Sequence, residues 1–202
     1  MAPPDSSPAA RRALRAGLNA ARRALTPGER ARAARRIAHH AEHALHLRSG
    51  ARVALYAALP HELDCAPLLE LAERRGCRIY LPRIDRPRAA RGMRFIARGA
   101  RLRVNHLGIE EPQGDAALGA RWLDVVFLPL VGFDRRGVRL GSGGGYYDRA
   151  FAFRRWRSVW HAPLLVGVGY ACQELEHIVA AAHDVRMDMV ITEEGPIRCA
   201  TG

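Results

Sequence analysis

The chain has 202 residues, of which 49% are hydrophobic and 26% charged, and its formal net charge is +12. This length and apolar content suit one globular domain with a substantial core. All 32 basic residues are arginine, so a lysine Schiff base, a lysine general base and a phosphate-binding loop lysine are excluded. The positive charge is spread along the chain and aromatic residues make up only 6%, which argues against nucleic acid as the partner.

The compartment is indicated by what the sequence lacks. The N-terminus has no signal-peptide pattern, and the four cysteines form no C-x-x-C pair. No stretch approaches the roughly 20 apolar residues that span a bilayer, and the best candidate, residues 122–133, is interrupted by Asp124. We therefore expect a reduced, cytoplasmic protein with no membrane partner.

The first part of the chain predicts a tail and two helices. Residues 1–8 contain three prolines and two serines, which is typical of a mobile tail. An amphipathic helix is predicted for residues 9–25, where apolar residues recur at helical spacing: Leu14, Leu18, Ala21 and Leu25. A second helix is predicted for residues 27–47, because Thr26 and Glu29 have the spacing of a capping box around a proline at the first helical position.

Strands and helices alternate through the rest of the chain. Strands are predicted at residues 52–57, 78–81, 93–97, 125–130, 164–168 and 187–191. Further helices are predicted at residues 66–75, after the glycine-rich loop described next, and around residues 174–182. This alternation implies an α/β fold, in which residues 9–202 form a single three-layer α/β/α domain with a largely parallel central sheet and an N-terminal helical pair.

The most informative segment is Arg139–Arg149, with the sequence RLGSGGGYYDR. Its four glycines let the backbone approach a ligand closely and adopt positive φ, so that N–H groups can surround phosphate oxygens. A helix is expected to begin at Tyr146 and to direct its positive end toward the same anion. The segment follows an apolar strand, which places it near the carboxyl end of the sheet.

Glycines alone would favour a flexible turn, but the flanking arginines, tyrosines and Asp148 favour a binding loop. The segment matches neither the P-loop pattern nor the dinucleotide-binding fingerprint, and it predicts a nucleotide site of a different kind.

These motifs, in this order, resemble those of the 5-formyltetrahydrofolate cyclo-ligase family, also called 5,10-methenyltetrahydrofolate synthetases. The Gly-Gly-Gly-Tyr-Tyr-Asp core at residues 143–148 is specific, and the other pieces support the resemblance by their order along nearly the whole chain. Those pieces are residues 11–15, 59–64, 81–83, 107–112, 131–134, 167–170 with Gln173, and 183–193.

The resemblance implies an ATP- and Mg²⁺-dependent cyclisation of 5-formyltetrahydrofolate to 5,10-methenyltetrahydrofolate, with release of ADP and phosphate. In that scheme the formyl oxygen attacks the γ-phosphate of ATP, N10 attacks the activated formyl carbon, and phosphate leaves. The expected partners are ATP and the folate, with or without a polyglutamate tail, and the expected state is a monomer.

The resemblance also implies roles for individual residues. The ATP-binding set is Arg11, Arg15, Arg139, Gly141, Ser142, Gly143, Gly144, Gly145 and Tyr146. The folate-binding set is Glu62, Tyr146, Tyr147 and Gln173; Arg139 and Tyr147 are the catalytic candidates, and Asp148 and Asp184 the Mg²⁺ ligands. Arg11 stands where the family usually has lysine, which keeps the charge but changes its reach and geometry.

Several alternatives remain open from the residues alone. Asp148 also suits a helix N-terminus, and Asp188 is either a competing metal ligand or the structural partner of an arginine. His39, His43 and His46 share a helix face at a spacing that binds zinc, but they lack a nearby cysteine or an H-E-x-x-H pattern and are expected to be solvated. Two other functions are a nucleic-acid-binding protein that uses the arginine-rich surface, and a family relative that binds nucleotide or folate without cyclisation.

Overall fold

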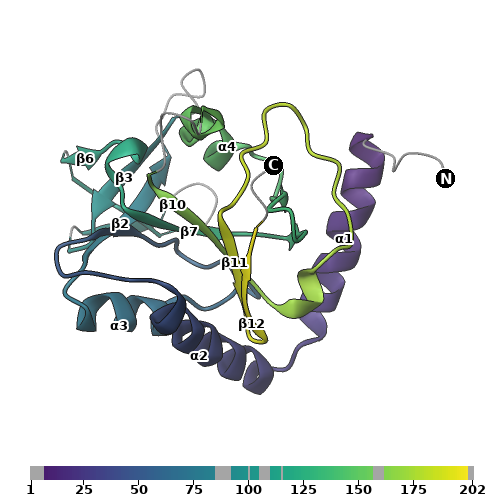
Figure 1. Cartoon of the computed structure of the whole chain (residues 1–202), viewed down its shortest axis with the longest axis horizontal. Coiled ribbons are helices and arrows are strands. Elements are labelled where there is room, and N and C mark those ends of the chain that lie inside the picture. The colour runs from purple at the N-terminus through teal and green to yellow at the C-terminus, as the bar shows by residue number, and fades with distance from the viewer. Residues whose placement is uncertain are drawn as a thin grey trace.

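An eight-stranded mixed sheet organises the chain (Figure 1). The computed structural model describes residues 7–84, 92–99, 101–104, 110–114, 116–156 and 162–199. The strands of this sheet are β1 (Arg52–Ala54), β2 (Arg78–Ile84), β3 (Met93–Ala97), β6 (Ala117–Leu118), β7 (Val125–Pro129), β10 (Leu164–Val168), β11 (Met189–Thr192) and β12 (Gly195–Arg198). Their order is β12-β11-β10-β7-β1-β2-β3-β6. The strands from β11 to β2 are parallel, and antiparallel pairing is confined to the two ends.

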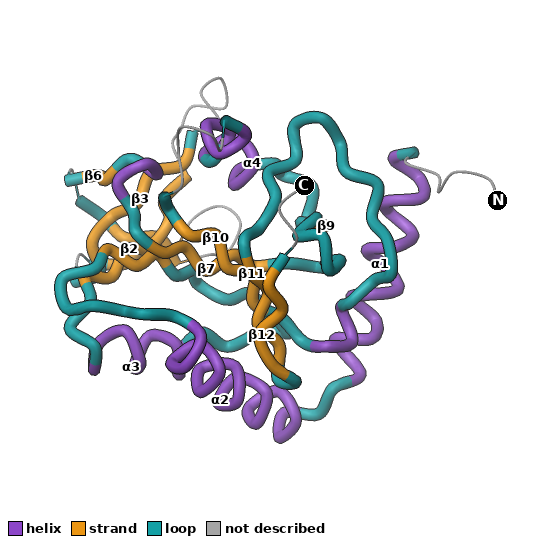
Figure 2. The backbone as a smooth tube through the Cα atoms, viewed as in Figure 1, coloured by secondary structure: helices purple, strands orange, loops and turns teal. Residues whose placement is uncertain are grey.

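Two separate hairpins and a set of helices complete the fold, and Figure 2 shows the helices in purple along the backbone. The hairpins pair β4 (Leu102–Val104) with β5 (Glu110–Pro112), and β8 (Gly132–Phe133) with β9 (Arg139–Leu140). The α-helices are α1 (Pro8–Ala24), α2 (Pro27–Ala44), α3 (Ala66–Arg74) and α4 (Tyr146–Ala150). Short 3-10 helices are η1 (Ala120–Trp122), η2 (Ala152–Arg155) and η3 (Ala171–Gln173). No helix among the described residues is long and apolar enough to cross a membrane.

The sheet lies between two helical layers, because successive side chains of a strand point to opposite faces. Val53 and Val166 face the cluster that contains the apolar sides of α2 and α3. Ala54 and Leu165 face the opposite cluster, which α4 and η2 cover. Ile37 of α2 is completely buried, and burial of such a side chain contributes about 1.5–3 kcal/mol. The predicted three-layer α/β/α architecture is confirmed.

The predicted start of α2 is confirmed in detail. Thr26 Oγ1 accepts from the backbone N–H of Glu29 at 3.2 Å, and the Glu29 carboxylate accepts from the N–H of Thr26 at 2.8 Å. This capping box satisfies two N–H groups that the helix start would leave unpaired.

Helix α1 packs beside the β8–β9 hairpin. Leu18 of α1 is buried in a small cluster with Val131, Leu140 and Ile178. Gly132 permits this approach, since a Cβ there would lie 2.5 Å from Leu18 Cδ1. The packing brings the N-terminal half of α1 next to the glycine-rich loop.

The predicted helix around residues 174–182 is wrong. Beyond η3 the segment is irregular, and side chains from elsewhere bind its backbone groups. The buried carboxylate of Asp134 accepts from the N–H of Ile178 at 3.0 Å, and Arg136 donates to the Ile178 carbonyl at 2.8 Å. These bonds replace the i→i−4 bonds of a helix.

Element boundaries differ from the prediction by small amounts. Strand β1 ends at Ala54 instead of continuing to residue 57, and α1 begins at Pro8, with Ser7 as its N-cap. The predicted tail therefore loses residues 7–8, and residues 1–6 lie outside the described residues, as do residues 107–109 of the quoted motifs.

Candidate active site

A cavity of about 430 Å³ lies at the carboxyl ends of the parallel strands. Pro129 ends β7, Tyr56 follows β1, and Ile84 ends β2, and all three line the cavity. From β1 the chain continues to β2 on one side, whereas β7 and β10 lie on the other side. The site therefore occupies the point where the strand order reverses, which is where open α/β sheets bind ligands.

The glycine-rich loop forms one wall of this cavity. Gly143 and Gly145 adopt φ values of +106° and +62°, which are unfavourable for residues with a side chain. Among the described residues, no acceptor bonds the backbone N–H groups of Ser142, Gly143 or Gly144. The predicted helix does begin at Tyr146, but it has only five residues. Free N–H groups of the loop, more than a long helix dipole, therefore suit this wall to an anion.

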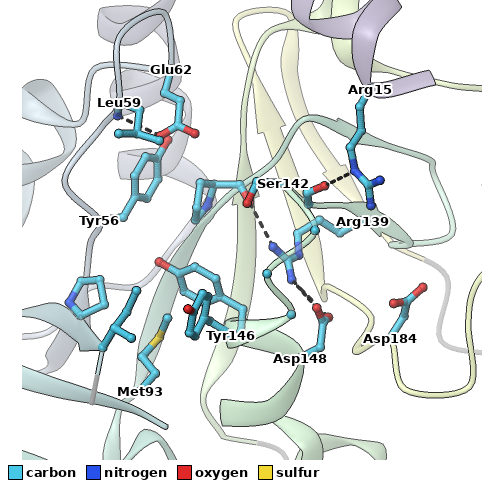
Figure 3. A pocket seen from close by; sticks show the side chains of 18 of the residues that line it. Arg15, Tyr56, Leu59, Glu62, Met93, Arg139, Ser142, Tyr146, Asp148 and Asp184 are labelled. Carbon is cyan, nitrogen blue, oxygen red and sulfur yellow. Dashed lines mark hydrogen bonds and ion pairs between the residues drawn. The ribbon is translucent and has the colours of Figure 1, made fainter. Parts of the chain in front are cut away.

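Arg139 is the central cation of the site (Figure 3). Its Nη2 donates to both oxygens of Asp148, at 3.1 and 3.2 Å, and its Nη1 donates to the Pro129 carbonyl at 3.3 Å. Its guanidinium lies 5.4 Å from the centre of the Tyr147 ring. The Nε–H is buried and has no acceptor among the residues that the structure describes. A buried donor without a partner is unfavourable, so this group suits a ligand oxygen.

Helix α1 contributes two further arginines. Arg15 Nε donates to the Gly141 carbonyl at 2.8 Å, which ties the helix to the loop. Arg11 Nη2 donates to Asp184 Oδ2 at 3.0 Å and to the Val179 carbonyl at 2.6 Å. Partial burial and the adjacent charge of Arg11 lower the pKa of the Arg15 guanidinium. The concentrated positive charge therefore suits a polyanionic ligand.

Asp148 and Asp184 line the same cavity from distant parts of the sequence. Figure 3 shows both carboxylates on one side of the site. Asp148 also accepts from the N–H of Val185 at 3.3 Å, which connects the two segments. Within the described parts of the chain, no three His, Cys, Asp or Glu residues gather to hold a metal. Two carboxylates with free lone pairs still fit Mg²⁺, which is commonly bound by one or two carboxylates together with phosphate and water oxygens.

The opposite wall is aromatic and apolar, with one carboxylate. Glu62 lies there, and its Oε2 accepts from the N–H of Leu59 at 3.0 Å. Tyr147 contributes its ring, and burial raises the pKa of its hydroxyl, so that the hydroxyl stays protonated near neutral pH. The sequence predictions missed Tyr56, Pro82, Ile84 and Met93, which also line this wall. For Tyr56, Ile84 and Met93, a position at or next to a strand end was the available signal.

Comparison with known proteins agrees with this geometry. The family model for the 5-formyltetrahydrofolate cyclo-ligase family matches residues 7–193. The chain belongs to this family.

Its similarity to individual cyclo-ligases extends over most of the chain. It is 37% identical to the 5-formyltetrahydrofolate cyclo-ligase of Escherichia coli (strain K12) over 144 residues, which cover 69% of this chain and 76% of the relative. The cyclo-ligase of Haemophilus influenzae is 30% identical over 179 residues, 87% of this chain and 93% of the relative. The NMR structure of Aquifex aeolicus 5,10-methenyltetrahydrofolate synthetase superposes with a TM-score of 0.79 at 27% identity, covering 95% of this chain and 94% of that one.

The predicted site residues line the cavity with one exception. The predicted site residues that line it are Arg11, Arg15, Glu62, Arg139, Gly141, Ser142, Gly143, Gly144, Gly145, Tyr146, Tyr147, Asp148 and Asp184. Gln173 does not line it, so its predicted role in folate binding is corrected. Its side chain is buried and saturated by the backbone: Oε1 accepts from Tyr170, and Nε2 donates to the carbonyls of Leu130 and Val131.

The other candidate metal ligands in the sequence were Asp188 and three histidines, His39, His43 and His46. Asp188 lies outside the cavity and accepts from Arg154 at 2.8 Å through both carboxylate oxygens, which decides its role in favour of the arginine pair. His43 on α2 bonds through Nδ1 to the His39 carbonyl at 2.8 Å. Helix α2 ends at Ala44, so His46 lies beyond it and the predicted common helix face of the three histidines is wrong; they are part of no metal-binding cluster in the described chain.

Proposed function

We propose that the protein catalyses the ATP- and Mg²⁺-dependent cyclisation of 5-formyltetrahydrofolate to 5,10-methenyltetrahydrofolate. The observation that carries the proposal is the division of one cavity into two halves. One half presents arginines, glycine N–H groups and paired carboxylates, and the other presents aromatic and apolar side chains with Glu62. A polyphosphate and a pterin ring system require these two chemistries side by side.

At the phosphate half, the protein acts by positioning and by charge stabilisation. The N–H groups of residues 142–144 bind phosphate oxygens, and the free Nε–H of Arg139 donates to the transferred group. Asp148 and Asp184 would hold Mg²⁺, which supplies neutralisation of the phosphate charge. Arg15, tied to the loop by the Gly141 carbonyl, offsets the negative charge that develops as the bond to ADP breaks.

At the folate half, the protein holds the two reacting groups of one substrate together. The Glu62 carboxylate accepts N–H groups of the pterin, and Tyr147 offers its ring and a protonated hydroxyl. The formyl oxygen attacks the γ-phosphorus, ADP leaves, and N10 then attacks the formyl carbon. Phosphate departs with the former formyl oxygen, and N10 loses its proton.

The same proposal includes a monomer in the cytoplasm. All four cysteines are free, which suits a reducing compartment.

The test is formation of the methenyl product, followed by its absorbance, from purified protein with 5-formyltetrahydrofolate, Mg²⁺ and ATP. We expect product only when ATP is present. A folded protein that forms none would refute the proposal. Binding of RNA or DNA that weakens steeply with salt would then favour the nucleic-acid alternative, and saturable binding of ATP or folate without product would favour a non-cyclising relative.

A further inference from the structure

The turn at residues 59–62 carries Glu62 into the cavity in a strained conformation. The N–H of Glu62 donates to the Leu59 carbonyl at 2.9 Å, and the N–H of Leu59 donates to the Glu62 carboxylate at 3.0 Å. Within the turn, Pro60 precedes His61, whose φ is +68°. Proline followed by a residue with positive φ is the pattern of a type II turn, in which glycine normally takes the second place. Apart from glycines, His61 is the one described residue with positive φ.

An imidazole contact gives a reason for histidine at this strained position. His61 Nδ1 lies 3.3 Å from Nη1 of Arg30 on α2. A guanidinium only donates, so Nδ1 is the acceptor and the ring proton is on Nε2. Arg30 is itself fixed, because the same Nη1 donates to the Leu25 carbonyl at 2.9 Å. Glycine would remove the strain and would also remove this link to α2.

The turn is held from its other side by Tyr170. This completely buried residue donates its hydroxyl to the Glu62 carbonyl at 3.4 Å. Its backbone N–H donates to Gln173 Oε1 at 2.8 Å. Gln173 is in turn bound to the carbonyls that follow β7. Gln173 does not reach the cavity, but through Tyr170 it supports Glu62, which does.

We propose that His61 and Tyr170 are positioning residues that fix the Glu62 carboxylate for the folate, an inference that rests on the proposed function. Neither residue lines the cavity, so each acts through Glu62. Strained backbone persists where the surroundings hold it in place, and such strain gathers at ligand-binding positions. Here α2 and the segment after β10 provide the two fixed points.

The experiment compares the KM values for the two substrates in His61→Gly and Tyr170→Phe. Each variant loses one hydrogen bond to the turn, so the KM for 5-formyltetrahydrofolate should rise about fivefold while the KM for ATP stays unchanged. The melting temperature of His61→Gly should stay close to that of the wild type, because relief of the positive φ offsets the lost hydrogen bond to Arg30. Arg30→Ala should reproduce the folate effect, and Arg35→Ala, exposed on the same helix, is the matched control with neither KM changed.

A double-mutant cycle with Glu62→Gln tests whether the effect passes through the carboxylate. Once Glu62→Gln has raised the folate KM, His61→Gly should add less than a twofold change, because the residue on which His61 acts is already impaired. Three results would each overturn the inference: effects of His61→Gly and Glu62→Gln on the folate KM that multiply fully in the double variant, an equal rise of the KM values for folate and ATP, or no change in the folate KM. A wild-type protein that makes no product overturns the proposed function and this inference with it, whereas active wild type with unchanged variants overturns this inference alone.

Discussion

Replacement of Asp148 by asparagine separates the two tasks that the structure gives this carboxylate. Asp148 pairs with Arg139, and the two side chains are 16% and 7% exposed. Asparagine keeps an oxygen for the Arg139 donor but removes the charge. We expect a stability loss of about 1.5–3 kcal/mol, the range for a hydrogen bond to a charged group. In a protein of this size 1 kcal/mol corresponds to about 2–4 °C, so the melting temperature should fall by roughly 3–12 °C.

Turnover should suffer far more than stability. Loss of a residue that merely supports a metal ligand already costs about 10- to 100-fold, so loss of a proposed Mg²⁺ ligand should lower kcat at least about 100-fold. The assay is the methenyl absorbance measured well below the melting temperature of the variant. Direct titration with Mn²⁺ in the presence of ATP should show weaker metal binding. Asp148→Ala is less informative, because it would leave the buried Arg139 charge unpaired.

Asp188→Asn is the matched control for this prediction. Asp188 also accepts from a buried arginine, Arg154, and their side chains are 10% and 2% exposed. It lies outside the cavity, so its asparagine variant should lose comparable stability and keep its turnover. Equal loss of turnover in both variants, or wild-type turnover in Asp148→Asn, would refute the assignment of the metal to Asp148.

Three further predictions concern the phosphate wall and the core. Arg15→Ala should raise the KM for ATP about tenfold through loss of a charged contact, whereas the exposed Arg12→Ala on the same helix should not change it; equal values would contradict the ATP role. Gly143→Ala should cost about 1–2 kcal/mol in a denaturant titration, because φ is +106° while the nearest atoms to a new Cβ are 3.8 Å away; an unchanged midpoint would show that the loop relaxes. Burial raises the pKa of the Cys65 thiol from about 9 to about 12. The stability that the buried, protonated thiol contributes is therefore complete below pH 9 and is lost as the pH rises toward 12. Between pH 9 and 12 the free energy of unfolding should therefore fall less steeply with pH in Cys65→Ala than in the wild type, and the two slopes should differ by about 1.4 kcal/mol per pH unit. Equal slopes for the two proteins would contradict the raised pKa of Cys65.

Local signals predicted most of the fold. The Thr26–Glu29 capping box and the apolar run of β10 lie where the sequence indicated, because each depends on neighbours within a few residues. The predicted helix around residues 174–182 failed for the opposite reason. Its backbone groups bind Asp134 and Arg136, about 40 positions earlier in the chain, and no local pattern contains that partnership.

In the candidate site, too, features that depend on neighbouring residues were predicted and features that depend on distant residues were not. The glycine loop and Asp148 were predicted from chemistry that is visible in one segment of the sequence, whereas Glu62 and Asp184 were implied only by the family resemblance. Tyr56 and Met93 were missed because an apolar residue at a strand end looks alike in a pocket wall and in a core. Gln173 was misplaced because a polar side chain in a motif gives no sign of whether ligand or backbone satisfies it, and here the backbone does.

Arginine stands at position 11, where the family usually has lysine. The change of reach suggested a poorer contact, but the guanidinium fits the residues around it. One nitrogen, Nη2, serves both Asp184 and the Val179 carbonyl. Within the described chain, Nε and Nη1 of Arg11 have no hydrogen-bond partner. A planar guanidinium can therefore hold the carboxylate in place and still present donors to a phosphate, whereas a lysine ammonium would have to divide one nitrogen among all three acceptors. A chain without lysine thus keeps a cation at this site whose geometry allows it to orient Asp184, the proposed metal ligand, and to contact the proposed nucleotide at the same time.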